Sequence, residues 1–88
     1  MSAFCLPMPV LSDNEFDQLA SAFITGPYRH HKGGLYEVLG LGREEATLQV
    51  VVIYKACKNN TLWTRTLEVF TELVDTPQGQ RPRFEPVQ

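Results

Sequence analysis

The chain has 88 residues, of which 43% are hydrophobic and 10% aromatic, and its formal net charge is −2 at pH 7. This length supports one hydrophobic core, and the apolar content is too high for a disordered chain. The weak negative charge argues against a protein that coats duplex nucleic acid, because such binding depends on a dense basic surface. Residues 29–65 nevertheless hold six of the eight basic residues, so an anionic ligand is compatible with the middle of the chain.

Residues 1–11 are expected to form an extended apolar arm. Prolines, which disfavour regular strand pairing, interrupt its large apolar side chains. These side chains are Leu6, Met8, Val10 and Leu11. The arm lacks the basic start of a signal peptide, and no segment approaches the ~18 apolar residues that span a bilayer. We therefore expect a cytoplasmic protein without membrane contact.

A helix is predicted over residues 12–25. Ser12 and Glu15 have the spacing of a capping box, in which each side chain accepts a hydrogen bond from a backbone N–H at the helix start. Apolar residues then recur at intervals of three and four, at Phe16, Leu19, Ala20 and Phe23. Gly26-Pro27 is expected to end the helix. We interpret it as a lid packed against a sheet, and a partner-binding helix is the alternative.

Residues 26–88 have the patterns of strands and turns. Leu35 to Leu41 alternates weakly between apolar and polar residues. Residues 47–57 contain the run Val50 to Tyr54, which is apolar on both faces and typical of a central strand. A strand with two apolar faces also suits pairing with another molecule, and we expect the protein to form a homodimer.

The rest of the chain predicts further strands joined by turns. Lys58-Asn59-Asn60-Thr61 supplies turn residues, and Leu62 to Leu67 is the expected returning strand. A short helical turn is predicted around Leu67 to Val69 and is followed by a strand. Pro77-Gln78-Gly79 forms the last turn before an extended tail over Pro82 to Val87. The fold class is mainly β, a small SH3-like barrel or a strongly bent antiparallel sheet with one N-terminal helix, in a single domain.

The central hairpin carries a mixed aromatic and basic cluster. A two-residue loop at Asn59-Asn60 places Lys58 opposite Thr61, Ala56 opposite Trp63, and Tyr54 opposite Arg65. Tyr54, Trp63 and Arg65 then share one face, where a guanidinium between two rings is a favourable arrangement. The other face is the predicted core side and carries Val51, Ile53, Cys57 and Leu62. A loop of odd length would exchange the two faces.

The stretch from Tyr28 to Gly40 resembles a family of short bacterial proteins of unknown function, whose signature runs roughly Y-x-H-x-K-G-x-x-Y-x-V-L-G. Later parts of that signature, L-W-x-R-P and P-R-F, are similar to residues 62–66 and 82–84. The chain departs from it at Thr66, where the family usually has Pro. It also departs at residues 43–47, where the family often has a His-Ser-Glu-Thr-like segment. The resemblance implies a small β-barrel-like fold and carries no established activity.

We predict one ligand surface around the hairpin cluster. Its members combine aromatic rings with interleaved cations, which suits a nucleobase stacked on a ring with its phosphate near Lys or Arg. They are Tyr28, His30, Lys32, Tyr54, Trp63, Arg65 and Arg83. The alternative is a structural role, in which Tyr54 and Trp63 edge the core and Arg65 pairs with Glu37 or Glu68.

Metal binding, cofactor binding and catalysis are not expected. His30 and His31 are adjacent and would point to opposite sides of an extended segment, and neither Cys5 nor Cys57 has metal-ligand spacing. The cysteines are interpreted as free thiols, with a disulfide left open. Gly33-Gly34 lacks a phosphate-loop pattern. The sequence thus predicts a small binding module for single-stranded nucleic acid or a nucleotide-like ligand, and the alternative is a protein-interaction or homo-oligomerisation module.

Overall fold

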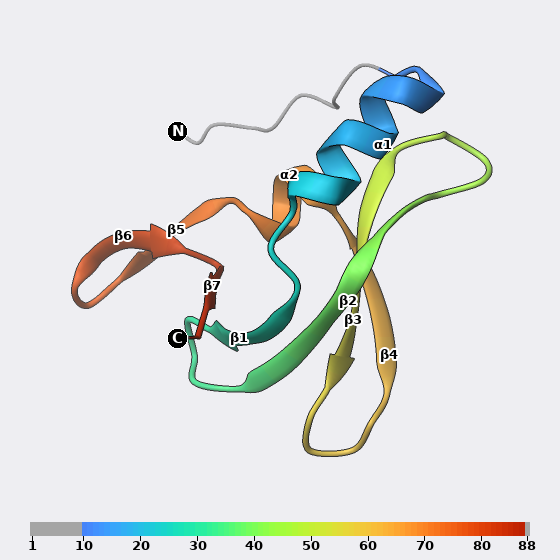
Figure 1. Ribbon diagram of the computed structural model, residues 1–88. Helices are drawn as coiled ribbons and strands as arrows, with labels where there is room; N and C mark the ends of the chain where they lie inside the picture. The colour runs from blue at the N-terminus through green and yellow to red at the C-terminus, as the bar shows by residue number, and fades with distance from the viewer. Residues whose placement is uncertain (1–9, 88) are drawn as a thin grey trace.

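The protein forms a strongly bent antiparallel sheet with one N-terminal helix (Figure 1). The computed structural model describes residues 10–87, so most of the predicted arm lies outside the described residues. A five-stranded sheet has the order β4-β3-β2-β1-β7, and β5 and β6 form a separate two-stranded ribbon. The elements are α1 (Asp13–Ala22), β1 (Gly26–His30), β2 (Leu35–Arg43), β3 (Val50–Ala56), β4 (Leu62–Thr66), α2 (Leu67–Phe70), β5 (Leu73–Thr76), β6 (Gly79–Pro82) and β7 (Phe84–Pro86). The sheet does not close into a barrel, because β4 and β7 are its two edges.

Helix α1 begins at the predicted capping box. Glu15 N–H donates to Ser12 Oγ at 3.1 Å, and Ser12 N–H donates to Glu15 Oε1 at 2.8 Å. The helix ends at Ala22, before the expected Gly26-Pro27, because Phe23 already has an extended backbone with φ −74° and ψ 133°. This turn directs Phe23 toward Tyr28, and their ring centroids lie 6.4 Å apart.

The helix is attached to the sheet by its apolar side and by an arginine. Phe16, Leu19 and Phe23 pack against the buried core. Arg43 of β2 donates from Nη2 to Ser12 O at 2.9 Å, and its guanidinium lies 4.9 Å from the centre of the Phe16 ring. These contacts agree with the interpretation of α1 as a lid. Within the described residues, no helix is long and apolar enough to cross a membrane.

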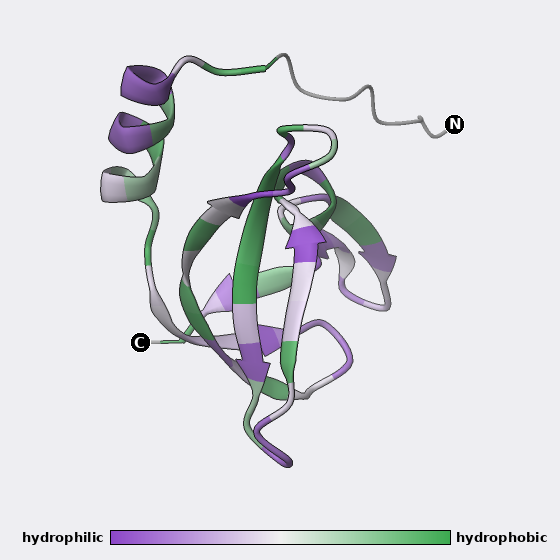
Figure 2. Cartoon of the chain, turned by 90° about the vertical axis from the view of Figure 1, so that its right-hand side faces the viewer, coloured by the Kyte–Doolittle hydropathy of each residue, from purple (hydrophilic) through white to green (hydrophobic). Residues whose placement is uncertain are grey.

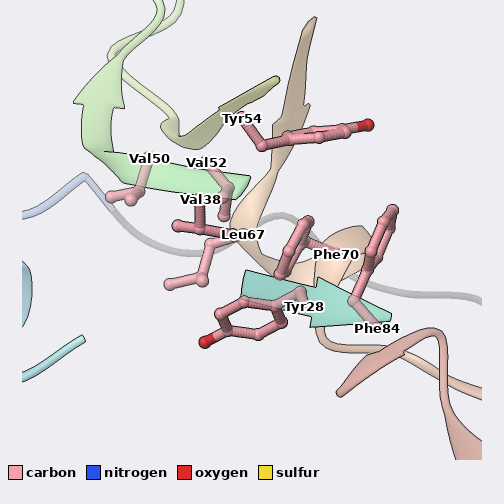
Figure 3. Packing of buried hydrophobic residues seen from close by; sticks show 8 residues of the cluster. All are labelled: Tyr28, Val38, Val50, Val52, Tyr54, Leu67, Phe70 and Phe84. Carbon is pink, nitrogen blue, oxygen red and sulfur yellow. The ribbon is translucent and has the colours of Figure 1, made fainter. Parts of the chain in front are cut away.

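The core lies on the concave side of the sheet, around the four-residue helix α2. Its buried members, shown in Figure 3, are Tyr28, Val38, Val50, Val52, Tyr54, Leu67, Phe70 and Phe84. Phe70 of α2 is only 1% exposed and stacks on Phe84 with a centroid distance of 4.2 Å. It also lies within 5.5 Å of the Tyr28 and Tyr54 ring centroids. The predicted helical turn therefore supplies the centre of the aromatic core.

The core side of the hairpin is the reverse of the predicted one. We expected the core on the face with Val51, Ile53, Cys57 and Leu62, but Leu62 is 61% exposed and Cys57 is also exposed. The sheet bends toward the other face, where α2 packs against β3. Val51 is buried but lies outside the core cluster. Figure 2 shows β3 hydrophobic over its first half and more polar toward the hairpin.

The β3–β4 hairpin has a longer loop than predicted. Ala56 N–H donates to Thr61 O at 2.9 Å, and Asn60 N–H donates to Ala56 O at 2.7 Å, so four residues form the loop. Asn60 has φ 60°, a conformation that asparagine tolerates well. Trp63 therefore lies opposite Tyr54. The predicted cross-strand partners were wrong by two residues. The set of residues predicted for each face was still right, because side chains alternate with a period of two. Only the face that forms the core was reversed.

The predicted extended tail is a paired edge strand. β7 is antiparallel to β1, with His30 opposite Phe84 and Tyr28 opposite Pro86. The predicted turn at Pro77-Gln78-Gly79 joins β5 to β6. Pro82 and Pro86 lie at strand ends, where a missing N–H costs least. The first and last strands of the described part of the chain therefore pair with each other.

Candidate functional site

The concave face has two different ends. Helices α1 and α2 lie at one end, and the β1–β2 turn and the β3–β4 hairpin lie at the other (Figures 1 and 2). We call this second region the open end. It contains His30, Lys32, Tyr36 and Trp63, and we include in it the adjoining Arg65 and Arg83, which lie between these residues and α2. Trp63 is 52% exposed there, although its strand partner Tyr54 is only 5% exposed. Aromatic surface is thus accessible at the open end and continuous with the buried core.

Tyr36 connects this surface to the core. Its ring makes edge-to-face contacts with Tyr54 and Phe84, at centroid distances of 5.5 Å and 5.4 Å. The ring centroid of His30 lies 6.3 Å away. Tyr36 is half-buried, so the contacts fix the ring while part of it remains accessible. Sequence reasoning missed Tyr36, although its alternation with Val38 placed it on the concave face.

His30 is the most electrostatically perturbed group of the open end. Its ring packs edge-to-face on Phe84 at 4.8 Å, and its Nδ1 accepts a hydrogen bond from Lys32 N–H at 3.1 Å. Partial burial lowers the pKa of His30, and the positive charges of His31, Arg83, Arg65 and Lys32 lower it further. The three permanent cations near His30, which are Lys32, Arg65 and Arg83, form an electrostatic environment that an anion would relieve.

Arg65 points along the concave face toward Tyr54. Its Nε lies 3.5 Å from Tyr54 Oη, which is a long hydrogen bond. The predicted alternative paired Arg65 with Glu37 or Glu68, but Glu37 lies 4.0 Å from Lys55 on the convex face. Among residues 10–87, no carboxylate lies within ion-pair distance of Arg65. Its positive charge is therefore not offset by an ion pair within the described part of the chain.

Arg83 is held more firmly. Its Nη2 donates to Glu72 Oε1 at 2.8 Å, and its Nε donates to Val69 O at 3.2 Å. These bonds fix the guanidinium between α2 and β7 and partly neutralise it. Arg83 still contributes to the positive potential at His30.

Two predicted site residues lie beneath the surface. Tyr28 is 4% exposed, and its hydroxyl donates to Ile24 O at 2.7 Å, while burial raises the pKa of this side chain. Tyr54 is similarly buried, and its hydroxyl lies 3.5 Å from Arg65 Nε. The structure thus places Arg65 beside Tyr54, brings Arg65 and Arg83 within electrostatic range of His30, and leaves Tyr28 inside the core.

A hollow of about 420 Å³ lies beside the open end, between the β1–β2 turn and the β3–β4 hairpin. Its lining residues are Gly33, Gly34, Leu35, Tyr36, Ala56, Cys57 and Lys58. A Cβ atom at Gly34 would lie 3.2 Å from the Tyr36 ring, so only glycine leaves this ring undisturbed. Within the described residues, no group of three or more His, Cys, Asp or Glu side chains is placed to hold a metal ion.

A protein family described as "Protein of unknown function (DUF1653)" matches residues 26–86, from the first strand to the last. The chain belongs to this family. A crystal structure of a DUF1653 protein from Bordetella bronchiseptica is 41% identical to this chain, with a TM-score of 0.71. The match covers 77% of this chain and 91% of the Bordetella protein. No curated protein matches the chain. The predicted membership of a family of unknown function is thus confirmed, and helix α1 precedes the DUF1653 region.

Proposed function

We propose that this DUF1653 protein is a binding module for single-stranded nucleic acid and that the open end of its concave face is the binding surface. The convergence of cations and accessible rings there supports this function. Lys32, Arg65 and Arg83 come from three separate segments of the chain. Each of them lowers the pKa of His30, so all three lie within electrostatic range of this residue. Tyr36 and Trp63 supply ring surface in the same region.

This combination suits an unpaired strand. Bases stack on accessible aromatic rings, and neighbouring cations neutralise the phosphates. A duplex hides its base faces and is held mainly through many phosphate contacts, which a chain with a net charge of −2 does not offer. Single strands therefore match the few cations and the accessible rings better than duplexes do.

The decisive experiment compares two charge-neutralising variants of the same hairpin. Arg65→Gln removes a charge from the concave face, and Lys55→Gln removes one from the convex face. We measure the binding of single-stranded DNA and RNA of about 8 nucleotides, a length that one small β domain covers. Fluorescence anisotropy of labelled strands gives the affinity, and Trp63 emission gives a second signal.

The wild-type protein should bind the single strands and bind the corresponding duplex more weakly. Arg65→Gln should weaken binding and reduce the slope of log K against log salt by about 0.7, the contribution of one phosphate on a single strand. Lys55→Gln should retain the wild-type slope. Equal slopes in both variants, or no binding of single strands by the wild-type protein, would refute the proposal.

Self-association is a second candidate function, favoured by the edge strand β4 and the convex face. Leu62 is 61% exposed and Leu39 is 48% exposed, which is unusual for large apolar residues on one small domain. A second copy that pairs along β4 would bond the free backbone groups of this edge strand and cover Leu62. Sedimentation at high micromolar concentration should then give a dimer that Leu62→Glu dissociates, whereas a monomer would exclude this function.

A further inference from the structure

We infer that the hollow beside Tyr36 receives one unpaired nucleobase, whose adjoining phosphates contact the cations of the open end. This inference rests on the proposed function and goes further, because it assigns a position to a base. The hollow of about 420 Å³ falls within the size range of small-ligand sites and exceeds the space needed by a few water molecules.

The lining of the hollow suits a flat ring. Leu35, Tyr36 and Ala56 give it apolar walls from two neighbouring strands. Tyr36 is supported on its core side by Tyr54 and Phe84, so its ring is held in place before a ligand arrives. A fixed aromatic ring offers stacking at little cost in conformational entropy.

The charges around the hollow suit the sugar-phosphate backbone. Lys58 is part of its lining, and Lys32 immediately precedes the lining residue Gly33. Tyr36 lines the hollow, and its ring centroid is 6.3 Å from that of His30. A base beside Tyr36 therefore has cations on both sides for its two flanking phosphates. None of the described residues that line the hollow is acidic.

Base recognition here requires a single strand. A paired base is stacked on both faces, whereas an unpaired base can leave the stack and enter a pocket. The hollow is formed by two turns that project at one end of the sheet, where a flexible strand can approach (Figure 1). The geometry thus links the pocket to the preference for single strands.

Cys57 makes this inference directly measurable, because it lines the hollow and has an exposed free thiol. In a Cys5→Ser background, Cys57 is the sole thiol of the full chain. We measure its alkylation rate with N-ethylmaleimide in the presence of an oligothymidine of about 8 nucleotides or an abasic strand of equal length. Anisotropy measured in parallel gives the fraction of protein bound.

At saturation the oligothymidine should slow alkylation of Cys57 at least severalfold, whereas the abasic strand at equal occupancy should leave the rate unchanged. Unchanged alkylation with bound oligothymidine would overturn the base pocket and leave the proposed function intact. Equal protection by the abasic strand would overturn it too, because the backbone alone would then cover the thiol. Absence of any binding in anisotropy would refute both proposals.

A second test fills the hollow. Cys57→Phe adds a ring within the lining, and Thr64→Phe adds the same ring to the convex face as a matched control. Cys57→Phe should weaken oligothymidine binding about tenfold, as expected for the loss of one stacked base, and should leave abasic binding unchanged. Thr64→Phe should bind both strands as the wild type does. Equal affinities in the two variants would overturn the inference, and the alkylation assay decides alone if Cys57→Phe does not fold.

Discussion

The two ends of the concave face use the same kinds of residue for different purposes. At the end covered by α1 and α2, which we call the closed end, Phe70 is 1% exposed and contacts four other aromatic rings. At the open end, Trp63 is 52% exposed, and Arg65 has no acidic partner among the described residues. β3 and β4 run through both ends, so strand sequence alone does not decide burial. The helices α1 and α2 decide it, because they cover only one end.

The largest expected effect follows from truncation at the closed end. Phe70→Ala should lower the free energy of unfolding by about 3–5 kcal/mol, since it leaves a cavity among the stacked rings. This loss is a large part of the about 5–15 kcal/mol that stabilises a typical domain. Urea unfolding followed by Trp63 emission measures it. A loss below about 1 kcal/mol would show that Phe70 is not the centre of the core.

Truncation at the open end should reduce binding strongly and stability only slightly. Trp63→Ala should reduce the affinity for single-stranded nucleic acid by about 1–3 kcal/mol, the value of one base stacked on a ring. Stability should fall far less than in Phe70→Ala, because half of the indole is already exposed. Anisotropy and circular dichroism give the two quantities. If Trp63→Ala unfolds, Trp63 has a structural role. If Trp63→Ala binds single strands as the wild type does, Trp63 is not part of the binding surface.

The sequence predicted well whatever depends on local signals. The capping box at Ser12 and the helical turn at Leu67 depend on interactions within a few residues, and both predictions are confirmed. The shared face of Tyr54, Trp63 and Arg65 follows from strand alternation, and it survives the wrong loop length. Local rules therefore placed three of the seven candidate residues on one face.

The sequence could not predict features that depend on distant contacts. The direction of the bend decides which face of β3 is the core, and it results from the packing of α2 against that strand. The pairing of β7 with β1 joins segments about 55 residues apart, so no local pattern indicates it. The burial of Tyr28 follows from this pairing and from Phe23. The hollow beside Tyr36 likewise needs two turns that only the fold brings together.

The smallest expected effect concerns pH and distinguishes the two ends by their titratable groups. Tyr28 at the closed end has its pKa raised above 10.0 by burial, so it stays neutral at physiological pH. His30 at the open end has its pKa lowered below 6.5, chiefly by partial burial and then by neighbouring cations. As pH falls below 6.5, the unfolded chain therefore binds a proton at this residue before the folded chain does. The His30 contribution to stability is present above pH 6.5 and is lost as pH falls toward the folded-state pKa.

His30→Gln should abolish this contribution, so the difference in unfolding free energy between wild type and variant should change with pH only in that window. Binding should change in the opposite direction, because a phosphate near His30 favours the protonated imidazole and raises its pKa. Wild-type affinity should thus increase as pH falls from 7 toward 5.5, and the affinity of His30→Gln should increase less. If the affinities of the two proteins change equally with pH, His30 does not contact the ligand. His30 would then be a structural residue that packs against Phe84.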